Sequence, residues 1–264
     1  SGLPSVKEVF DTTPYTILVV DDNPDMTDFL KRTFEGYFKR IIIAGDGVEA
    51  LQLVRSHVPD IIVSDVMMPR MNGYELCKTI KEDIAISHIP VILLTAKDDK
   101  QSLISGYKNG ADGYLSKPFE VEMLMELIRN RLKNREYTKK RYLNAGLIPT
   151  PEESTISLTD ETFLIKLNSI IQENIDNTNL GIQFICQEVG LGRSSLYNKL
   201  KALTGMGANE YISKLRIEKA ITLISGTDMP FSEIAEKTGF TTPSYFSTTF
   251  KQYTGETPSQ YKER

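Results

Sequence analysis

The sequence predicts an α/β domain followed by an all-α domain. In the first half, five short apolar runs alternate with five segments of helical period, which indicates a parallel sheet covered by helices on both sides. From Thr159 the strand pattern stops, and two pairs of short helices are expected instead. We place the first domain at residues 15–134 and the second at 159–264. Residues 1–14 are expected to be an N-terminal linker or cloning residues, and residues 135–158 a linker between domains.

The composition is that of soluble globular domains. The 264 residues are 40% hydrophobic and 25% charged, enough for about two domains. The chain has no apolar run long enough to span a bilayer, and Ser1–Tyr15 lacks the features of a signal peptide. Two cysteines, Cys77 and Cys186, fall in different domains, so we expect no disulfide framework and a cytoplasmic location. With two histidines and no Cys/His cluster, the residues do not favour a zinc site or a histidine-based triad.

Charge is unevenly distributed along the chain. Residues 1–128 carry 13 basic and 20 acidic side chains, residues 129–159 carry 7 and 3, and residues 160–264 carry 11 and 12. The acidic first block fits a domain that binds a cation or a basic partner. The last block lacks the excess of basic residues typical of nucleic-acid binding, which counts against that function for this block.

The expected elements of the first domain follow from its apolar pattern. Its strands are continuous apolar runs that suit a sheet buried on both faces, at Ile17–Val20, Ile41–Ala44, Ile61–Ser64, Val91–Thr95 and Gly113–Leu115. Its first helix begins at Pro24, where Asn23 can serve as the cap. Apolar residues at helical spacing place the other helices at Gly47–Arg55, Tyr74–Lys81, Leu103–Asn109 and Val121–Leu132.

The second domain carries an internal repeat. After a helix capped by Asp160, the expected helices are Ile182–Val189, Ser194–Leu203, Ala208–Ile224, Phe231–Thr238 and Ser244–Tyr253. The first two of these helices form one pair and the last two form another, and each pair is joined by a short turn that contains glycine. A helix, a short turn and a second helix is the helix-turn-helix pattern. Residues 196–205 and 246–255 share the order apolar, three residues, apolar, Lys, two residues, Thr-Gly. This repetition supports two related helix-turn-helix units.

Acidic and polar residues stand where several strands of the first domain end. Asp21 and Asp22 follow the first strand, Asp65 the third, Thr95 ends the fourth and Lys117 follows the fifth. In a parallel sheet these ends share one edge, so the side chains are expected to meet. Three close carboxylates require a balancing cation, and all-oxygen ligands favour Mg²⁺. A cation beside a nucleophilic carboxylate, with a lysine and a hydroxyl nearby, suits phosphoryl transfer.

Residues 15–135 resemble the receiver domain of two-component response regulators. The match rests on Asp21-Asp22, on Asp65 in Asp-Val-Met-Met-Pro-Arg-Met-Asn-Gly, on Thr95-Ala96 and on Lys117-Pro118-Phe119. The resemblance implies a flavodoxin-like (βα)5 fold with the parallel sheet order 2-1-3-4-5. It also implies that Asp65 is phosphorylated from a phosphohistidine of a histidine kinase. Mg²⁺ would be bound by Asp22, Asp65 and the backbone carbonyl of Met67, with Asp21 assisting directly or through water.

The same resemblance assigns roles to the switch residues. Lys117 would pair with the phosphate, Thr95 would hydrogen-bond it, and Tyr114 would move inward with Thr95. The Lys117–Pro118 bond is expected to be cis. Read singly, these side chains are a solvated lysine, a strand-end hydroxyl and a half-buried aromatic. A dehalogenase-like phosphatase also phosphorylates its own aspartate, but it has an acid two residues later, where this chain has Met67. We therefore expect no enzyme activity beyond the chain's own phosphoryl transfer and dephosphorylation.

Residues 160–262 resemble the DNA-binding domain of the AraC family. The most specific matches are Ile234-Ala235, Gly239-Phe240, Tyr245-Phe246 and Phe250-Lys251. The resemblance implies that two recognition helices enter successive major-groove segments, about 34 Å apart on one face of DNA. Phe231, Ile234, Ala235 and Phe240 are expected to be core residues by their spacing.

The expected DNA contacts lie opposite the apolar stripe of each recognition helix. Leu196, Leu200 and Leu203 should face inward in the first helix, and Phe246, Phe250 and Tyr253 in the second. The expected contacts of the first helix are Arg193, Ser194, Tyr197 and Asn198, and those of the second are Pro243, Ser244, Ser247 and Thr248. Arg and Asn can read guanine and adenine, while Lys199, Lys201 and Lys251 are expected to contact phosphates. The alternative for each residue is a solvated helix face.

Together these patterns predict a DNA-binding transcription regulator that dimerises when Asp65 is phosphorylated. One alternative is the output portion of a hybrid sensor, in which the histidine kinase and the regulator share one chain. Another is a receiver that serves as a phosphate sink or protein-docking module.

Overall fold

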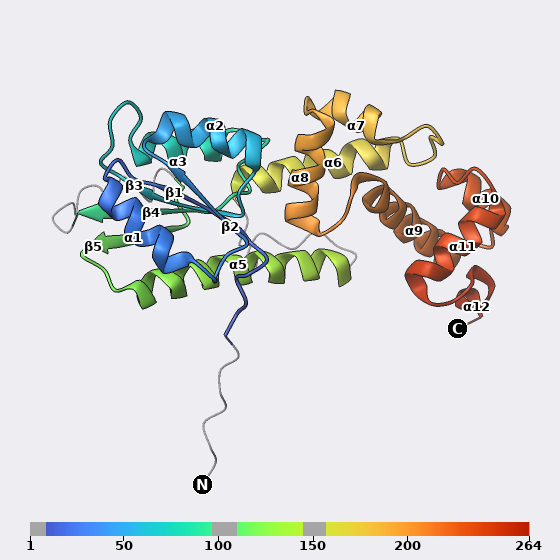
Figure 1. Cartoon of the computed structure of the whole chain (residues 1–264). Helices are drawn as coiled ribbons and strands as arrows, with labels where there is room; N and C mark the ends of the chain where they lie inside the picture. The colour runs from blue at the N-terminus through green and yellow to red at the C-terminus, as the bar shows by residue number, and fades with distance from the viewer. Residues whose placement is uncertain (1–8, 97–109, 145–156, 264) are drawn as a thin grey trace, which may run out of the picture. The chain divides into compact units, whose positions relative to one another are not determined.

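The computed structural model describes residues 9–96, 110–144 and 157–263. They form two compact units (Figure 1). The first unit contains the described residues up to Tyr137, together with residues 157–159. The second unit contains residues 138–144 and the described residues from Asp160 onward. The helix predicted at Leu103–Asn109 lies outside the described residues. Within the described ranges, no helix is both long enough and apolar enough to cross a membrane.

The first unit is built on a five-stranded parallel sheet. Its strands are β1 (Thr16–Val20), β2 (Arg40–Ala44), β3 (Ile61–Asp65), β4 (Val91–Ala96) and β5 (Gly113–Lys117). They lie in the order β2-β1-β3-β4-β5, and every neighbouring pair is parallel. The predicted fold and strand order are therefore confirmed. Because all strands run the same way, their carboxyl ends lie along one edge of the sheet.

Helices cover both faces of this sheet. One face carries α1 (Pro24–Phe34) and α5 (Val121–Asn144), and the other carries α2 (Gly47–His57) and α3 (Gly73–Glu82) (Figure 1). Along β1, Ile17 and Val19 pack in the core beside α1 and α5, while Leu18 and Val20 pack in the core beside α2 and α3. This alternation is the two-residue period of a strand, and burial on both faces explains why the runs are apolar throughout.

Helix caps fix where the chain enters each helix after a strand. Asn23 caps α1 by accepting a hydrogen bond from the backbone N–H of Asp25, and Pro24 takes the first helical position. Asp46 caps α2, and Asn72 caps α3 within a reciprocal capping box. These caps stand next to the carboxyl ends of β1, β2 and β3, so they shape the loops around that edge.

Helix α5 is longer than the sequence predicted. It continues past Leu132 to Asn144, so the first ten residues of the expected linker are helical. Burial explains this extension, because Leu132 and Tyr142 are both buried and Arg135 forms an ion pair with Asp60 at 3.5 Å. Several of the charged residues that suggested a linker are therefore part of a helix and are partly buried.

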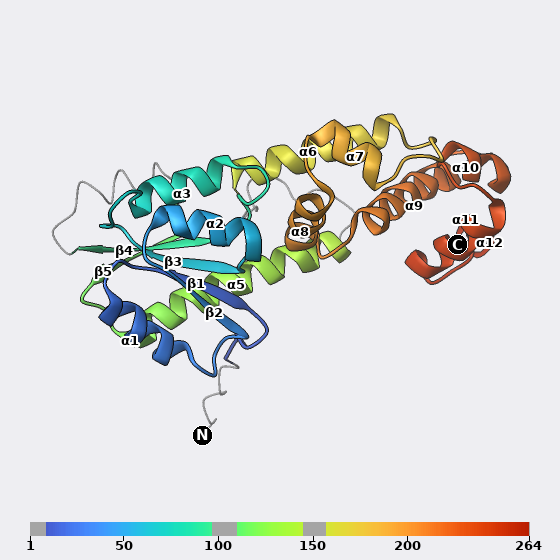
Figure 2. The ribbon, with the colours of Figure 1, turned by 45° about the horizontal axis from the view of Figure 1, so that its top comes forward.

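The second unit is all α-helical, as predicted. Its helices are α6 (Leu158–Glu173), α7 (Ile182–Val189), α8 (Arg193–Thr204), α9 (Ala208–Gly226), α10 (Phe231–Lys237), α11 (Pro243–Thr254) and α12 (Pro258–Lys262). The two predicted helix-turn-helix pairs are α7 with α8 and α10 with α11. Helix α9 joins them and packs against both recognition helices, α8 and α11 (Figure 2).

Each helix-turn-helix pair is held by an apolar interior. Leu196 and Leu200 of α8 are fully buried, and in the second pair Ile234, Phe246 and Phe250 are fully buried against α9. The predicted core residues Ala235 and Phe240 are buried as well, whereas Phe231 is partly buried. The turn after α7 uses Gly190 at φ 71°, a conformation that suits glycine because it has no Cβ.

Candidate functional site

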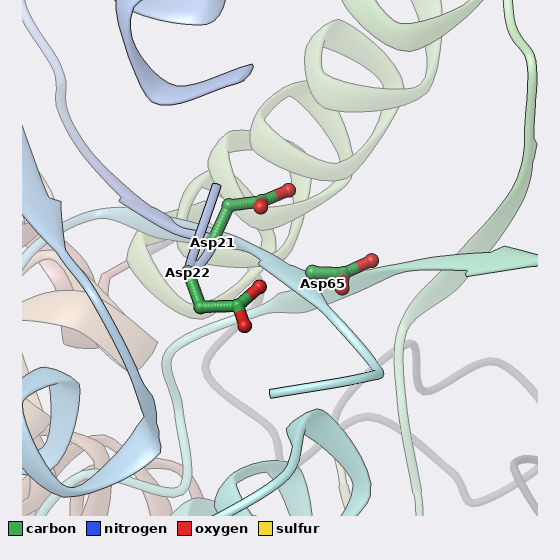
Figure 3. Close-up of side chains that lie close together, drawn as sticks. All are labelled: Asp21, Asp22 and Asp65. Carbon is green, nitrogen blue, oxygen red and sulfur yellow. The ribbon is translucent and has the colours of Figure 1, made fainter. Parts of the chain in front are cut away.

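The carboxyl edge of the sheet brings three aspartates together. Val20 pairs with Ser64 in the register of β1 and β3, so the next residues, Asp21 and Asp65, stand level on neighbouring strands. Asp22 follows Asp21, and the three residues offer carboxylate oxygens within 4.8 Å of one another (Figure 3). Asp21 and Asp65 are buried while Asp22 is exposed, so the cluster is open to solvent on one side.

Lys117 reaches this cluster from the end of β5. Its Nζ lies 2.7 Å from Asp65 Oδ1 and 2.9 Å from Asp21 Oδ2. Ala96 pairs with Lys117 in the register of β4 and β5, and the Lys117–Pro118 peptide bond is cis, as predicted. One ammonium group facing three carboxylates leaves a formal charge of −2, which a divalent cation would balance. The donor set consists of oxygen atoms only, which fits Mg²⁺.

Burial and charge act on the site in opposite directions. Burial raises the pKa of the Asp65 carboxyl above its ordinary value, and the Asp21 carboxylate adds to this rise, while Lys117 partly offsets it. Burial lowers the pKa of Lys117, but its hydrogen bonds to Asp65 and Asp21 outweigh burial, so the pKa is raised and the ammonium stays charged. The site thus holds a carboxylate in surroundings that stabilise its charge poorly, beside a permanent cation.

Backbone groups orient the two buried carboxylates. Asp65 Oδ2 accepts a hydrogen bond from the backbone N–H of Met67 at 3.2 Å, and Asp21 Oδ1 accepts one from Asn23 at 2.9 Å. Met67 itself is 72% exposed, in the loop that follows β3. Each carboxylate therefore uses one oxygen for a backbone N–H and the other for Lys117.

The two predicted switch residues lie on neighbouring strands. Thr95 is buried near the end of β4, and Tyr114 on β5 is partly buried against the core beside α2 and α3. Thr95 pairs with Ser116 in the strand register, which places the threonine at the same sheet edge as the aspartates. Tyr114 stands two residues earlier on β5, away from that edge.

Several residues around the site were not singled out from the sequence. A Cβ on Gly73 would lie 2.2 Å from the Asp65 carbonyl oxygen, so only glycine lets α3 start this close to Asp65. Ser64 is fully buried and its hydroxyl donates to the Asp65 carbonyl oxygen at 2.8 Å. Buried Asp46 forms an ion pair with Arg70. Gly73 ends the motif quoted around Asp65 and follows the cap residue Asn72, so a local signal for it was present. The Asp46 contact joins distant segments and leaves no local signal.

The predicted DNA-contacting face of α8 is largely solvent-accessible. Arg193, Ser194 and Lys201 are exposed, Tyr197 is 50% exposed and Asn198 is partly exposed. The inward stripe of Leu196, Leu200 and Leu203 is buried, as predicted. Arg193 also donates to Gln183 of α7 at 3.3 Å, which ties the first residue of α8 to the preceding helix.

Lys199 lies elsewhere than predicted, and its assignment as a phosphate contact is corrected. Its side chain is completely buried, and its Nζ lies 2.5 Å from Asp160 Oδ1 and 5.0 Å from the centre of the Phe163 ring. A lysine enclosed in this way cannot reach a phosphate. The reason is helical geometry, because Lys199 stands three residues after Leu196 and four before Leu203, on the inward stripe.

The outward face of α11 is accessible but carries little charge. Pro243, Ser244, Thr248 and Lys251 are exposed, and Ser247 is partly exposed. Tyr253 was predicted to face inward, but it is 37% exposed and its hydroxyl donates to the Glu210 carbonyl oxygen at 2.9 Å. Lys251 is the only basic side chain in α11, so this helix offers mainly hydroxyl groups.

Comparisons with known proteins agree with these two sites. Residues 17–129 match the response regulator receiver domain family, and residues 185–264 match a helix-turn-helix domain family, of the AraC type. A chain with a receiver domain followed by a helix-turn-helix domain belongs to the class of response regulators whose output domain is of a DNA-binding type. Both predicted resemblances are confirmed.

Individual relatives place the chain in a family. Response regulator MprA of Mycobacterium sp. (strain KMS) is 36% identical over 165 residues, which cover 58% of this chain and 70% of that protein. The chain therefore belongs to the response regulator family. Histidine kinase P4 of Formosa agariphila is 41% identical over 249 residues, covering 94% of this chain and 18% of that protein. DNA-binding response regulator MtrA of Mycolicibacterium smegmatis is 37% identical over 136 residues, covering 52% and 58%. The chain thus spans less than two thirds of these last two relatives.

Proposed function

We propose that this chain is a transcription regulator whose binding to double-stranded DNA is controlled by phosphorylation of Asp65. The observation that carries the proposal is the cluster of three aspartates with Lys117 in contact with Asp65, on the same chain as two helix-turn-helix units. The cluster suits phosphoryl transfer to Asp65. The helix-turn-helix units supply a DNA-binding surface whose affinity for DNA the phosphoryl group can change.

In the proposed reaction, an oxygen of Asp65 attacks the phosphorus of a phosphohistidine on a histidine kinase. A phosphorus–oxygen bond forms, the phosphorus–nitrogen bond breaks, and the imidazole nitrogen keeps the electron pair and takes up a proton. Asp22, Asp65 and the carbonyl of Met67 would hold Mg²⁺, with Asp21 assisting, and the bound ion would neutralise charge on the transferred phosphoryl oxygens. The chain catalyses only this transfer and its own dephosphorylation.

Lys117 and Thr95 then hold the product. Lys117 already contacts Asp65 at 2.7 Å, so its ammonium can follow the added negative charge, and Thr95 supplies a hydroxyl at the same sheet edge. Movement of Thr95 toward the phosphate leaves space that Tyr114 fills, which gives the receiver two states. The face that includes β5 and α5 pairs two chains in the phosphorylated state.

Dimerisation strengthens DNA binding because it joins two weak sites. The charge of residues 160–264 is close to neutral, so one copy has few phosphate contacts. Two copies raise the effective concentration of the second copy at its half-site. Arg193 and Asn198 of α8 read bases, Lys201 and Lys251 contact phosphates, and the short polar side chains of α11 contribute less to sequence discrimination. The proposed setting is the bacterial cytoplasm.

The test compares wild type with Asp65→Asn in the full chain, with Mg²⁺ and acetyl phosphate as the phosphodonor. DNA from a random pool is selected with phosphorylated wild type, and affinities are then measured by fluorescence anisotropy. We expect phosphorylation to tighten binding by about tenfold or more in wild type and to leave Asp65→Asn unchanged. Asp28→Asn removes an exposed carboxylate from α1 and serves as the matched control. Equal affinity with and without the phosphodonor would refute the switch, and failure to enrich any DNA would favour the phosphate-sink or docking function.

A second candidate places this activity inside a longer protein. The match to histidine kinase P4 covers 94% of this chain but only 18% of that protein. This observation favours the output portion of a hybrid sensor, in which the kinase that phosphorylates Asp65 lies on the same polypeptide. The full reading frame at the chromosomal locus tests this: a histidine kinase domain upstream supports the hybrid, and a start codon immediately before the receiver contradicts it.

A further inference from the structure

The loop between β3 and α3 orients the phosphoacceptor. This loop, residues 66–72, donates the backbone N–H of Met67 to Asp65 Oδ2 at 3.2 Å. Its two ends are joined, because the N–H of Gly73, the first residue of α3, donates to the carbonyl oxygen of Val66, the first residue of the loop, at 3.0 Å. The direction in which Asp65 presents its second oxygen therefore depends on the conformation of the loop.

The loop also contacts the turn between β2 and α2. The Arg70 guanidinium forms an ion pair with the Asp46 carboxylate, and the Gly47 N–H donates to the Met71 carbonyl oxygen at 3.1 Å. A Cβ on Gly47 would come within 2.6 Å of Met71 Cγ, so the two segments are in close contact. Of these contacts, the ion pair is the one made by two side chains, so a side-chain substitution removes it directly.

Asp46 is a rigid anchor for this ion pair. It is 3% exposed, and its Oδ1 accepts the backbone N–H groups of Val48 at 2.8 Å and Glu49 at 3.1 Å as the cap of α2. Its Oδ2 is left for Arg70. Because the carboxylate is held by a helix, it fixes the position of the guanidinium and not the reverse.

Arg70 has an unusual backbone conformation for a residue with a side chain. Its φ is 64°, in the left-handed region that favours glycine. The backbone at this position is therefore strained, and the ion pair to Asp46 is an interaction that offsets the strain. Loss of the ion pair would release the loop toward other conformations, in which the Met67 N–H no longer points at Asp65.

We propose that Asp46 and Arg70 act as a positioning pair that holds the β3–α3 loop, and through the Met67 N–H orients Asp65 for phosphoryl transfer. Neither residue touches the transferred group. This inference rests on the proposed phosphorylation of Asp65, and it adds a residue pair that sets how quickly Asp65 accepts the phosphoryl group.

Four substitutions in the full chain test the pair. Arg70→Met removes the charge, Arg70→Lys keeps it, Arg70→Gly removes the ion pair and the backbone strain together, and Asp46→Asn weakens the ion pair while keeping a residue that caps helices well. Arg55→Met is the matched control, because Arg55 also forms a partly exposed ion pair, with Asp83 at 3.2 Å.

The rate of Asp65 phosphorylation is measured with acetyl phosphate and Mg²⁺ by intact-protein mass spectrometry. We expect Arg70→Met and Asp46→Asn each to slow the reaction by about tenfold, since small losses of orientation are costly for reactive groups. Arg70→Gly should slow it less than Arg70→Met, because the strain that displaces the loop is removed together with the ion pair. The double variant Arg70→Met with Asp46→Asn should be no slower than either single variant, because both remove the same interaction. Arg70→Lys should recover most of the rate, and Arg55→Met should equal wild type.

A direct readout separates positioning from loss of stability. Hydrogen exchange at the Met67 amide should be faster in Arg70→Met, while exchange in β1 and β3 and the midpoint of thermal unfolding stay close to wild type. Wild-type rates in Arg70→Met and Asp46→Asn, or additive effects in the double variant, would each overturn the inference. If wild type itself gains no phosphoryl group on Asp65, the proposed function fails first.

Discussion

Lys117 and Lys199 both form ion pairs with aspartates, but they differ in exposure to solvent and in the charge around them. Lys117 is shared between Asp21 and Asp65, its side chain is 28% exposed, and exposed Asp22 stands beside it. Lys199 has no exposed surface, and Asp160 is the carboxylate that it contacts. Both lysines were expected from the sequence to contact a phosphate. Only Lys117 combines excess negative charge with access for a ligand.

The difference teaches what separates a reactive charge cluster from a structural one. At Lys199 the ammonium lies against a buried carboxylate, and the Phe163 ring covers it. A pair enclosed in this way gives no access to a further ion from solvent. At Lys117 the charges do not balance, so a divalent cation or an added phosphoryl group changes the energy of the site. Reactivity follows from imbalance and access, and burial alone does not provide it.

The largest expected effect comes from breaking the buried pair. Lys199→Met leaves the Asp160 carboxylate buried without its cation, so we expect the free energy of unfolding of the second unit to fall by about 3–5 kcal/mol. Urea denaturation followed by circular dichroism measures this. The double variant Lys199→Met with Asp160→Leu should recover most of the loss, because it removes the buried carboxylate together with the lysine. A loss below about 1 kcal/mol in the single variant would contradict the structural role of the pair.

A smaller loss is expected where the receiver site depends on backbone contact. Gly73→Ala introduces a Cβ against the Asp65 carbonyl oxygen, and a backbone atom cannot move aside easily. We expect a loss of about 1–3 kcal/mol together with slower phosphorylation of Asp65. Gly45→Ala is the control, since its Cβ would meet the Glu49 carboxylate at an ordinary 3.5 Å. Equal stability of the two variants would show that α3 can shift without cost.

Removal of Lys117 should make the receiver depend more on Mg²⁺. Lys117→Met leaves Asp21 and Asp65 without their cation, so we expect a loss of about 1 kcal/mol in a chelator, reduced by solvent screening at this partly exposed site. Saturating Mg²⁺ should remove that loss, because binding to the folded state stabilises it. Thermal unfolding with and without Mg²⁺ tests this. In Lys199→Met, Mg²⁺ should raise the midpoint of thermal unfolding by no more than in wild type. A larger rise in Lys199→Met would contradict the difference that we draw between the two lysines.

The smallest effects are expected on the salt dependence of DNA binding. Lys201→Met and Lys251→Met each remove one expected phosphate contact, so the slope of log affinity against log salt should fall in magnitude by about 1. Lys199→Met, measured where it remains folded, should leave the slope unchanged because this side chain faces the interior. Fluorescence anisotropy over a series of salt concentrations provides the slopes. An unchanged slope for Lys201→Met would remove it from the DNA face.

The sequence was most informative where function depends on position along a strand. The strand after Asp60, the acid at its end and the matching acids after β1 were enough to predict a shared edge, because parallel strands must end together. The sheet order was predicted from the family resemblance, and the two helix-turn-helix units from a repeated pattern. Helix ends were less accurate, since α5 continues to Asn144 through contacts that its charged composition did not reveal.

The sequence alone therefore determined which residues gather at the carboxyl edge of the receiver. Asp21, Asp65 and Lys117 each stand at or just after the end of a strand, and the ends of parallel strands lie at one edge of the sheet. Only the tertiary structure decided what Lys199 and Arg70 do. Lys199 meets an aspartate 39 residues earlier in the chain, and Arg70 meets the cap of a different helix. A charged side chain acquires its role from the partner that folding brings to it, and that partner is set by packing between distant segments.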